Sequence, residues 1–164
     1  MHILNKKLKK AWRSYVLQSL LAALALMAIL YFLDILTHAA IVAALGASAF
    51  IIFAMPKSVL ARPTNVIGGH IMGVIAGALC YFALLYPPLR VSGRLLYICA
   101  AALSVSLSIL LMIITDTEHP PAATTALGVV AYGWSLWTAI FVLLFAVALS
   151  LVRFLLRPWL RELV

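Results

Sequence analysis

The sequence predicts an all-α membrane protein with four transmembrane helices plus two half-length, re-entrant helical segments. We expect them to be arranged as two repeats of about 82 residues within a single integral membrane domain, residues 1–164. Apolar residues make up 66% of the chain and charged residues 10%, whereas soluble domains have about 45–50% and about 25%. A folded chain of this length leaves much of its surface exposed, so many of these apolar side chains must face lipid.

The amino-terminal residues 1–14 are basic and precede the first apolar run, residues 15–33. A basic segment with aromatic side chains is typical of an interfacial anchor. The run 15–33 is too long for the apolar part of a signal peptide, so we expect it to be retained as the first span. The net charge is +8. Because the basic residues flank apolar runs, we expect them to set membrane topology, and we do not expect nucleic acid as a partner.

Three later runs also reach the length of about 17–25 residues that a transmembrane helix needs. They are residues 66–86, 95–115 and 134–156. Two further runs are shorter: residues 39–55 are of marginal length, and residues 122–131 are too short to cross a bilayer. The runs therefore predict four spans and two half-length segments.

The two short segments resemble each other when the chain is shifted by half its length, 82 residues. Six of the seventeen positions 34–50 are then identical without a gap, where roughly two would match by chance in a chain of such skewed composition. The matching positions in the first half are Asp34, Ala40, Ala44, Leu45, Gly46 and Ala49. We therefore predict two repeats, residues 15–86 and 95–157, an arrangement that is common in transporters.

The distribution of basic residues places both termini in the cytoplasm, and we expect the membrane to be the bacterial cytoplasmic (inner) membrane. It does not decide whether the short segments cross or turn back. Either topology leaves ten of the twelve basic residues on the cytoplasmic side. Segment length favours the re-entrant topology, because residues 122–131 cannot reach across. In that topology Lys57 and Arg62 lie on the side opposite the carboxy-terminal arginines.

The stretch 116–121 is the strongest candidate for a binding site. Pro120 and Pro121 suit the first turn of a helix, where a missing N–H has no intrahelical partner. The positive end of that helix then points at His119, and half-helix amino termini at membrane depth often bind substrates in transporters. Thr124 and Thr125 could supply further donors. The alternative is a rigid helix start with only a structural role.

Further candidates lie before and within the third run. His70 opens it beside Asn65 and Arg62, and could contact a substrate or stabilise a helix interface. Small residues four apart let a second helix approach closely, so a glycine series on one face predicts helix packing. The series is Gly69, Gly73 and Gly77.

Three acidic residues stand at the ends of apolar runs: Asp34, Asp116 and Glu118. Ionisable side chains at membrane depth are candidates for proton relay. No catalytic constellation, phosphate-binding loop or metal-ligand spacing is present, so we do not expect an enzyme, a cofactor or a metal site.

Three segments of the chain resemble the HPP family of integral membrane proteins. They are residues 46–49, residues 63–70 and residues 119–127, which begin with His-Pro-Pro. The resemblance covers about residues 13–157 and implies four membrane-spanning helices. It also implies an inorganic anion as substrate, since plastid members of plants are linked to nitrite transport, and it adds Ser48 and Asn65 to the candidate site. The chain departs from the family pattern at Thr64, usually Arg, and at Ala123, often Gly; Arg62 could replace the missing anion contact.

These observations predict a membrane transporter or channel for a small solute, most of all an inorganic anion such as nitrite. One alternative is a proton- or cation-coupled carrier that uses the three acidic residues. The other is a scaffold without transport activity, whose glycine series mediates assembly into a homo-oligomer. The lipid bilayer is the partner that all three hypotheses share.

Overall fold

The computed structural model describes residues 6–33, 39–84 and 94–164, and within these ranges the regular elements are all helical. Asp34 and the first five residues lie outside the described part. The elements are α1 (Lys6–Leu33), α2 (Ala39–Ala54), the short 3₁₀ helix η1 (Val59–Ala61), α3 (Pro63–Leu84), α4 (Arg94–Thr115), α5 (Pro120–Tyr132) and α6 (Leu136–Leu156).

Three of the described helices, α3, α4 and α6, are long and apolar enough to cross a membrane. The apolar part of α1 is shorter and begins only at Trp12. Helices α2 and α5 have 16 and 13 residues, or about 24 and about 20 Å at 1.5 Å per residue. Both are shorter than the hydrocarbon core of about 30 Å. An all-helical membrane fold is thus confirmed, while four spans and two repeats remain predictions.

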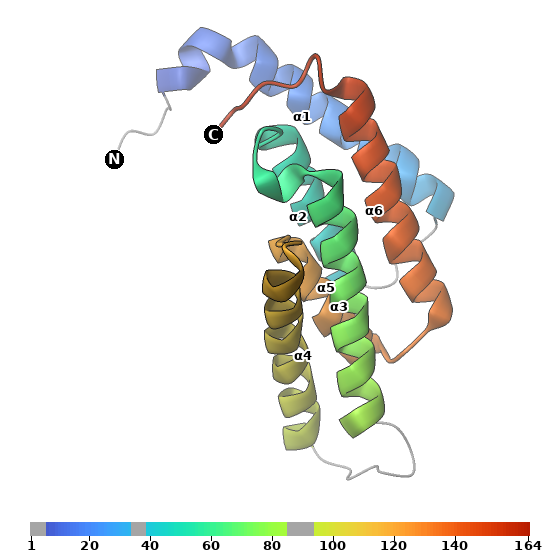
Figure 1. The fold of residues 1–164 in the computed structure, drawn as a ribbon. Coiled ribbons are helices and arrows are strands. Elements are labelled where there is room, and N and C mark those ends of the chain that lie inside the picture. Colours follow the sequence, from blue (N-terminus) through green and yellow to red (C-terminus); the bar gives the residue numbers. More distant parts are fainter. Residues whose placement is uncertain (1–5, 34–38, 85–93) are drawn as a thin grey trace.

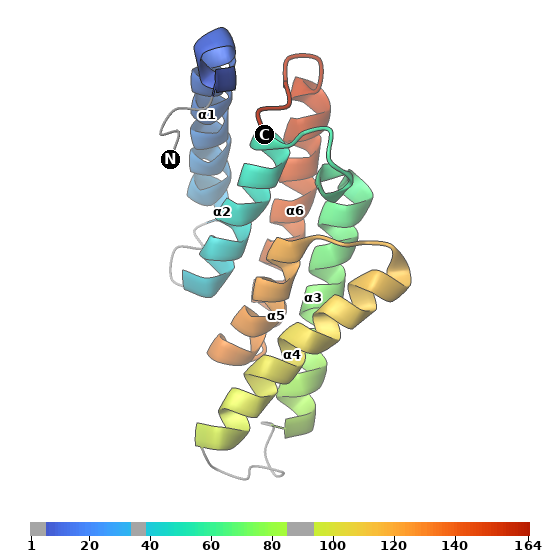
Figure 2. The same ribbon diagram turned by 90° about the vertical axis from the view of Figure 1, so that its left-hand side faces the viewer.

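Successive helices run in alternating directions along the bundle (Figures 1 and 2). Helix α2 therefore ends near the end of α6, whereas α4 begins at the opposite end of the bundle. Helix α5 lies in the middle, in contact with α2, α3 and α4. Much of the short helix is thus buried against other helices.

Helix α5 has clear start and stop signals. His119 precedes it with an extended backbone, and Pro120 and Pro121 occupy its first turn. At its other end Gly133 has a φ of 85°, a left-handed conformation that glycine adopts without steric cost. The predicted run 122–131 therefore lengthens by two residues at the start and by one at the end.

The three glycines predicted to serve helix packing lie where α3 meets α5. A Cβ atom added at Gly69 would lie 2.7 Å from Cβ of His119, and one at Gly77 would lie 2.7 Å from Cβ of Val129. One at Gly73 would collide with the carbonyl oxygen of Ala122. The absence of side chains at these three positions is what lets α5 approach α3 so closely.

The expected separation of Lys57 from the carboxy-terminal arginines is wrong. The backbone N–H of Lys57 donates to Oε2 of Glu162 at 3.0 Å, and Nη2 of Arg153 donates to the carbonyl oxygen of Pro56 at 2.6 Å. The N–H of Leu163 donates to the carbonyl oxygen of Ala54 at 3.0 Å. These bonds fix the direction of α2, which helix length alone could not decide.

Gln18 forms hydrogen bonds at the end of the bundle where α2 and α6 end. Its side chain is 1% exposed. Its Nε2 donates to the carbonyl oxygens of Phe53 and Arg161, at 2.5 and 2.8 Å, and its Oε1 accepts from the N–H of Arg161 at 3.0 Å. A single buried amide thereby joins α1, the end of α2 and the carboxy-terminal segment.

Candidate functional site

Four polar side chains meet in the interior of the bundle, and each is 0% exposed: Ser48, His70, His119 and Thr125. They come from α2, from α3, from the residue before α5 and from α5 itself. Close packing of α3 against α5 brings the two imidazole rings to a centroid distance of 5.3 Å. Buried polar groups are costly unless they are hydrogen-bonded, so their partners decide what this cluster can do.

The four side chains form one continuous hydrogen-bonded chain. Oγ1 of Thr125 lies 2.9 Å from Nδ1 of His70, and Nε2 of His70 lies 3.1 Å from Oγ of Ser48. The same Oγ lies 2.8 Å from Nε2 of His119. The chain ends on the backbone, where Nδ1 of His119 lies 2.9 Å from the carbonyl oxygen of Leu60 in η1. We refer to Thr125, His70, Ser48 and His119 as the buried polar chain.

The Leu60 carbonyl determines the direction of every bond in the buried polar chain. A carbonyl oxygen only accepts, so Nδ1 of His119 carries the proton, and Nε2 of a neutral His119 is an acceptor. Ser48 then donates to His119 and accepts from Nε2–H of His70. His70 in turn accepts the Thr125 hydroxyl at Nδ1. With both histidines neutral, every ring nitrogen is therefore hydrogen-bonded.

Ser48 has a second acceptor within reach, the carbonyl oxygen of Ala44 at 3.0 Å. Ala44 lies four residues earlier in the same helix, so its carbonyl is already positioned to accept the Ser48 N–H. If the hydroxyl turned to Ala44, Nε2 of a neutral His119 would be left buried without a donor. Such a loss costs about 1–3 kcal/mol. The hydroxyl therefore donates to His119 while that ring is neutral.

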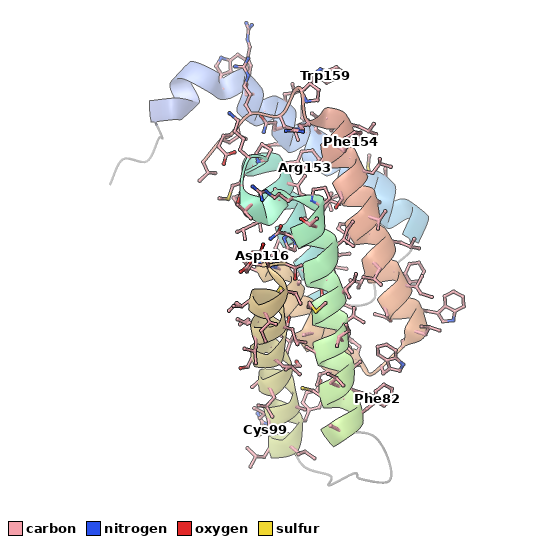
Figure 3. The ribbon with its side chains drawn as sticks, in the orientation of Figure 1. Phe82, Cys99, Asp116, Arg153, Phe154 and Trp159 are labelled. Atoms are coloured by element: carbon pink, nitrogen blue, oxygen red, sulfur yellow. The ribbon has the colours of Figure 1, made fainter. Side chains whose placement is uncertain are left out.

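The turn between α4 and α5 holds His119 in place. Asp116 has a φ of 54°, a left-handed conformation that lets the chain reverse at the end of α4. Figure 3 shows Asp116 at this turn, close to the start of α5. Nδ2 of Asn65 donates to the carbonyl oxygen of Glu118 at 3.2 Å, directly before His119. Asn65 is therefore placed to position the turn.

A basic pocket of about 560 Å³ lies at the end of the bundle where α2 and α6 end. It is lined by Pro56, Lys57, Arg62, Arg153, Arg157 and Leu160. Arg153 extends from α6 toward the turn between α2 and α3 (Figure 3). Its Nε atom is buried and has no hydrogen-bond partner within the described structure. Four cationic side chains thus face one space, and none of its lining residues is acidic.

Comparison with known proteins identifies the family of this chain. The family model for the transmembrane region of HPP proteins matches residues 7–161. The chain belongs to the HPP transmembrane family. This confirms the resemblance inferred from the His-Pro-Pro segment and its two companion segments.

Two transmembrane proteins of Dictyostelium discoideum are similar to this HPP protein. One is 42% identical over 87 residues, which is 53% of this chain and 28% of the relative. The other is 37% identical over 103 residues, 63% of this chain and 31% of the relative. The chain thus matches less than a third of the length of these relatives. No solved structure matches it.

The structure brings together only part of the predicted site of this HPP protein. His119, Thr125, His70 and Ser48 form the buried polar chain, and Asn65 lies beside it. The other candidates are spread around this cluster. Pro121 is buried, Thr124 and Glu118 are partly buried, Pro120 and Asp116 are exposed, and Arg62 lines the basic pocket.

Sequence reasoning missed two parts of the arrangement. One is the Leu60 carbonyl, a backbone group that has no signature in side-chain chemistry. The other is the convergence of Lys57 and Arg62 with Arg153 and Arg157, which were expected on opposite sides of the membrane. In the described part of the chain, no group of three His, Cys, Asp or Glu residues could hold a metal ion.

Proposed function

We propose that this HPP protein is a membrane transport protein, a transporter or channel, for a small inorganic anion such as nitrite. The observation that carries the proposal is the basic pocket, in which four cationic side chains face about 560 Å³ of space. A concave site lined by one sign of charge concentrates ligands of the opposite sign. The pocket also has room for an anion of a few atoms together with water.

Arg153 is the residue best placed to contact the anion. One of its terminal nitrogens already donates to Pro56, while its buried Nε has no partner in the described structure. A guanidinium group presents several donors in a planar array that matches paired oxygen acceptors. An oxyanion in the basic pocket would accept from the terminal nitrogens of this group. The nearby carboxylate of Glu162 accepts from the backbone of Lys57 and does not line the pocket.

The position of η1 supports a path from the basic pocket toward the buried polar chain. Arg62 lines the pocket directly after η1, while Leu60 within η1 accepts the hydrogen bond of His119. The amino terminus of α5 points at the same histidine, and its dipole favours negative charge there. Pro120 and Pro121 lack N–H groups, and the Ala122 N–H donates to the His119 carbonyl oxygen at 2.8 Å. The first turn of α5 therefore acts on the anion through its dipole, and the side chains of the basic pocket supply the direct contacts.

The test is flux through purified protein in liposomes. Vesicles are loaded with nitrite at alkaline pH, where little neutral acid leaks through lipid, and nitrite release is followed chemically. We expect release well above that of protein-free vesicles. Arg153→Gln and Arg62→Gln should each reduce it about tenfold, since the loss of about 1.4 kcal/mol of binding corresponds to that factor.

Arg94→Gln is the matched control, because Arg94 is exposed at the opposite end of the bundle. It should leave the flux unchanged. Equal losses in all three variants would show that the basic pocket is not the binding site. The same measurement is made with vesicles loaded with nitrate. If neither anion leaves the protein-containing vesicles faster than it leaves protein-free vesicles, the proposal itself is contradicted.

A further inference from the structure

We propose that the buried polar chain is a binding site for a single proton, with Nε2 of His119 as its final acceptor. The inference rests on the hydrogen-bond geometry and does not require the anion path. Its starting point is the direction imposed by the Leu60 carbonyl, which leaves Nε2 of His119 and Nδ1 of His70 as the two ring nitrogens without a proton. The added proton is assigned to His119, because a hydrogen bond from its Nδ1–H to a carbonyl oxygen strengthens when the ring is charged.

Thr125 is 0% exposed, so a hydronium ion reaches its hydroxyl only when the surrounding helices move apart. A proton supplied in this way can reach His119 by a sequence of short transfers. Thr125 accepts it and releases its own proton to Nδ1 of His70. His70 passes its Nε2 proton to Oγ of Ser48, and Ser48 passes its proton to Nε2 of His119. Thr125 and Ser48 regain their original proton counts, His70 changes only its tautomer, and His119 becomes a cation.

The loaded state keeps every bond of the buried polar chain, with the direction of three of them reversed. His119 now donates from Nε2 to Ser48, Ser48 donates to Nε2 of His70, and His70 donates from Nδ1 to Thr125. The bond from Nδ1 of His119 to Leu60 is unchanged. Because a carbonyl oxygen cannot pass a proton onward, the chain ends there. The site therefore stores one proton and does not conduct protons through the bundle.

Among the groups around His119, the amino terminus of α5 disfavours a positive charge, whereas the Leu60 carbonyl oxygen, which accepts from Nδ1–H, stabilises it. His70 is the titratable side chain in contact with His119, and the transfers leave His70 neutral. Helices α2 and α5 contribute Ser48 and Thr125, which carry no charge. Lys57 and Arg62 flank η1 and line the basic pocket, and Glu118 and Asp116 belong to the turn before α5. An anion held in that pocket would stabilise the added positive charge on His119.

The change of tautomer at His70 is the signature that separates this site from an ordinary histidine. We suggest nitrogen NMR on protein with labelled histidine. His2 and His38, outside the described residues, would be replaced by Gln so that only His70 and His119 report. At high pH we expect the Nδ1–H tautomer of His119 and the Nε2–H tautomer of His70. On acidification, His119 should gain its second proton in the same transition in which His70 moves its proton to Nδ1.

Two variants and a control sharpen the result. Thr125→Val removes the hydroxyl that starts the sequence, and Ser48→Ala removes the link between the rings; in both, His70 should keep one tautomer through the titration of His119. Ser106→Ala, an exposed position on α4, should behave as the parent protein.

Three outcomes would overturn the proposal. His70 in the parent protein keeps its Nε2–H tautomer, the two rings titrate independently, or neither ring titrates while the protein remains folded. Because no anion flux is measured, these outcomes are separate from the test of transport.

Discussion

At the scale of single residues, the Ser48 hydroxyl has an unusual position, since it lies within hydrogen-bonding distance of two buried imidazole rings. Ser48→Ala would leave Nε2–H of His70 without an acceptor and Nε2 of His119 without a donor. A buried polar group that loses its partner costs about 1–3 kcal/mol. We therefore expect a clear fall in the midpoint of thermal unfolding, measured in detergent.

Ser106→Ala is again the control, because Ser106 is exposed on α4 and its loss removes no bond of the buried polar chain. It should unfold within a degree or two of the parent protein. An unchanged midpoint for Ser48→Ala would mean that water replaces the hydroxyl, and that the two rings are not sealed from solvent.

The sequence could predict the members of the buried polar chain but not their connections. His119 and Thr125 follow from the Pro-Pro helix start, and His70 follows from its place at the beginning of an apolar run. Ser48 rested on the family resemblance alone. The bond to Leu60 could not be predicted, because it joins a side chain to a backbone oxygen 59 positions away. Such a bond depends on how η1 sits over α5.

At the scale of elements, the contact between α3 and α5 positions both histidines. Gly73→Ala would place a Cβ atom against the Ala122 carbonyl oxygen in α5. A methyl group forced into a packed contact typically costs about 1–3 kcal/mol. We expect a lower unfolding midpoint and, because α5 must move, a change in the ring nitrogen signals of His70 and His119.

Gly46→Ala is the matched substitution in α2, where a new Cβ atom would meet nothing within 4 Å. It removes the flexibility of a helical glycine without a collision, so it should leave stability unchanged or raise it by up to about 1 kcal/mol. Similar destabilisation by both substitutions would show that packing against α5 does not explain the effect of Gly73→Ala.

At the scale of the whole molecule, the alternating helix directions bring residues that are distant in sequence into one pocket. Helix boundaries were predictable, because prolines and polar turns punctuate the apolar runs. The path of the chain was not predictable, since the basic residues divide equally well between two topologies. Hydrogen bonds from Lys57, Arg153 and Leu163 place the end of α2 beside the end of α6 and the carboxy-terminal segment, and these tertiary contacts have no signature in the sequence.

The last prediction follows from this path and concerns access from the two sides of the membrane. Lys57 and Val164 are both exposed near the end of the bundle where α6 ends, and Arg94 is exposed at the opposite end. In a background lacking Cys80 and Cys99, an impermeant thiol reagent should label Lys57→Cys and Val164→Cys from one side and Arg94→Cys only from the other. The re-entrant topology predicts instead that positions 94 and 164 share a side and position 57 does not. Labelling in that pattern would separate Lys57 from Arg153 and Arg157 in the membrane, and the basic pocket could not exist as the structure shows it.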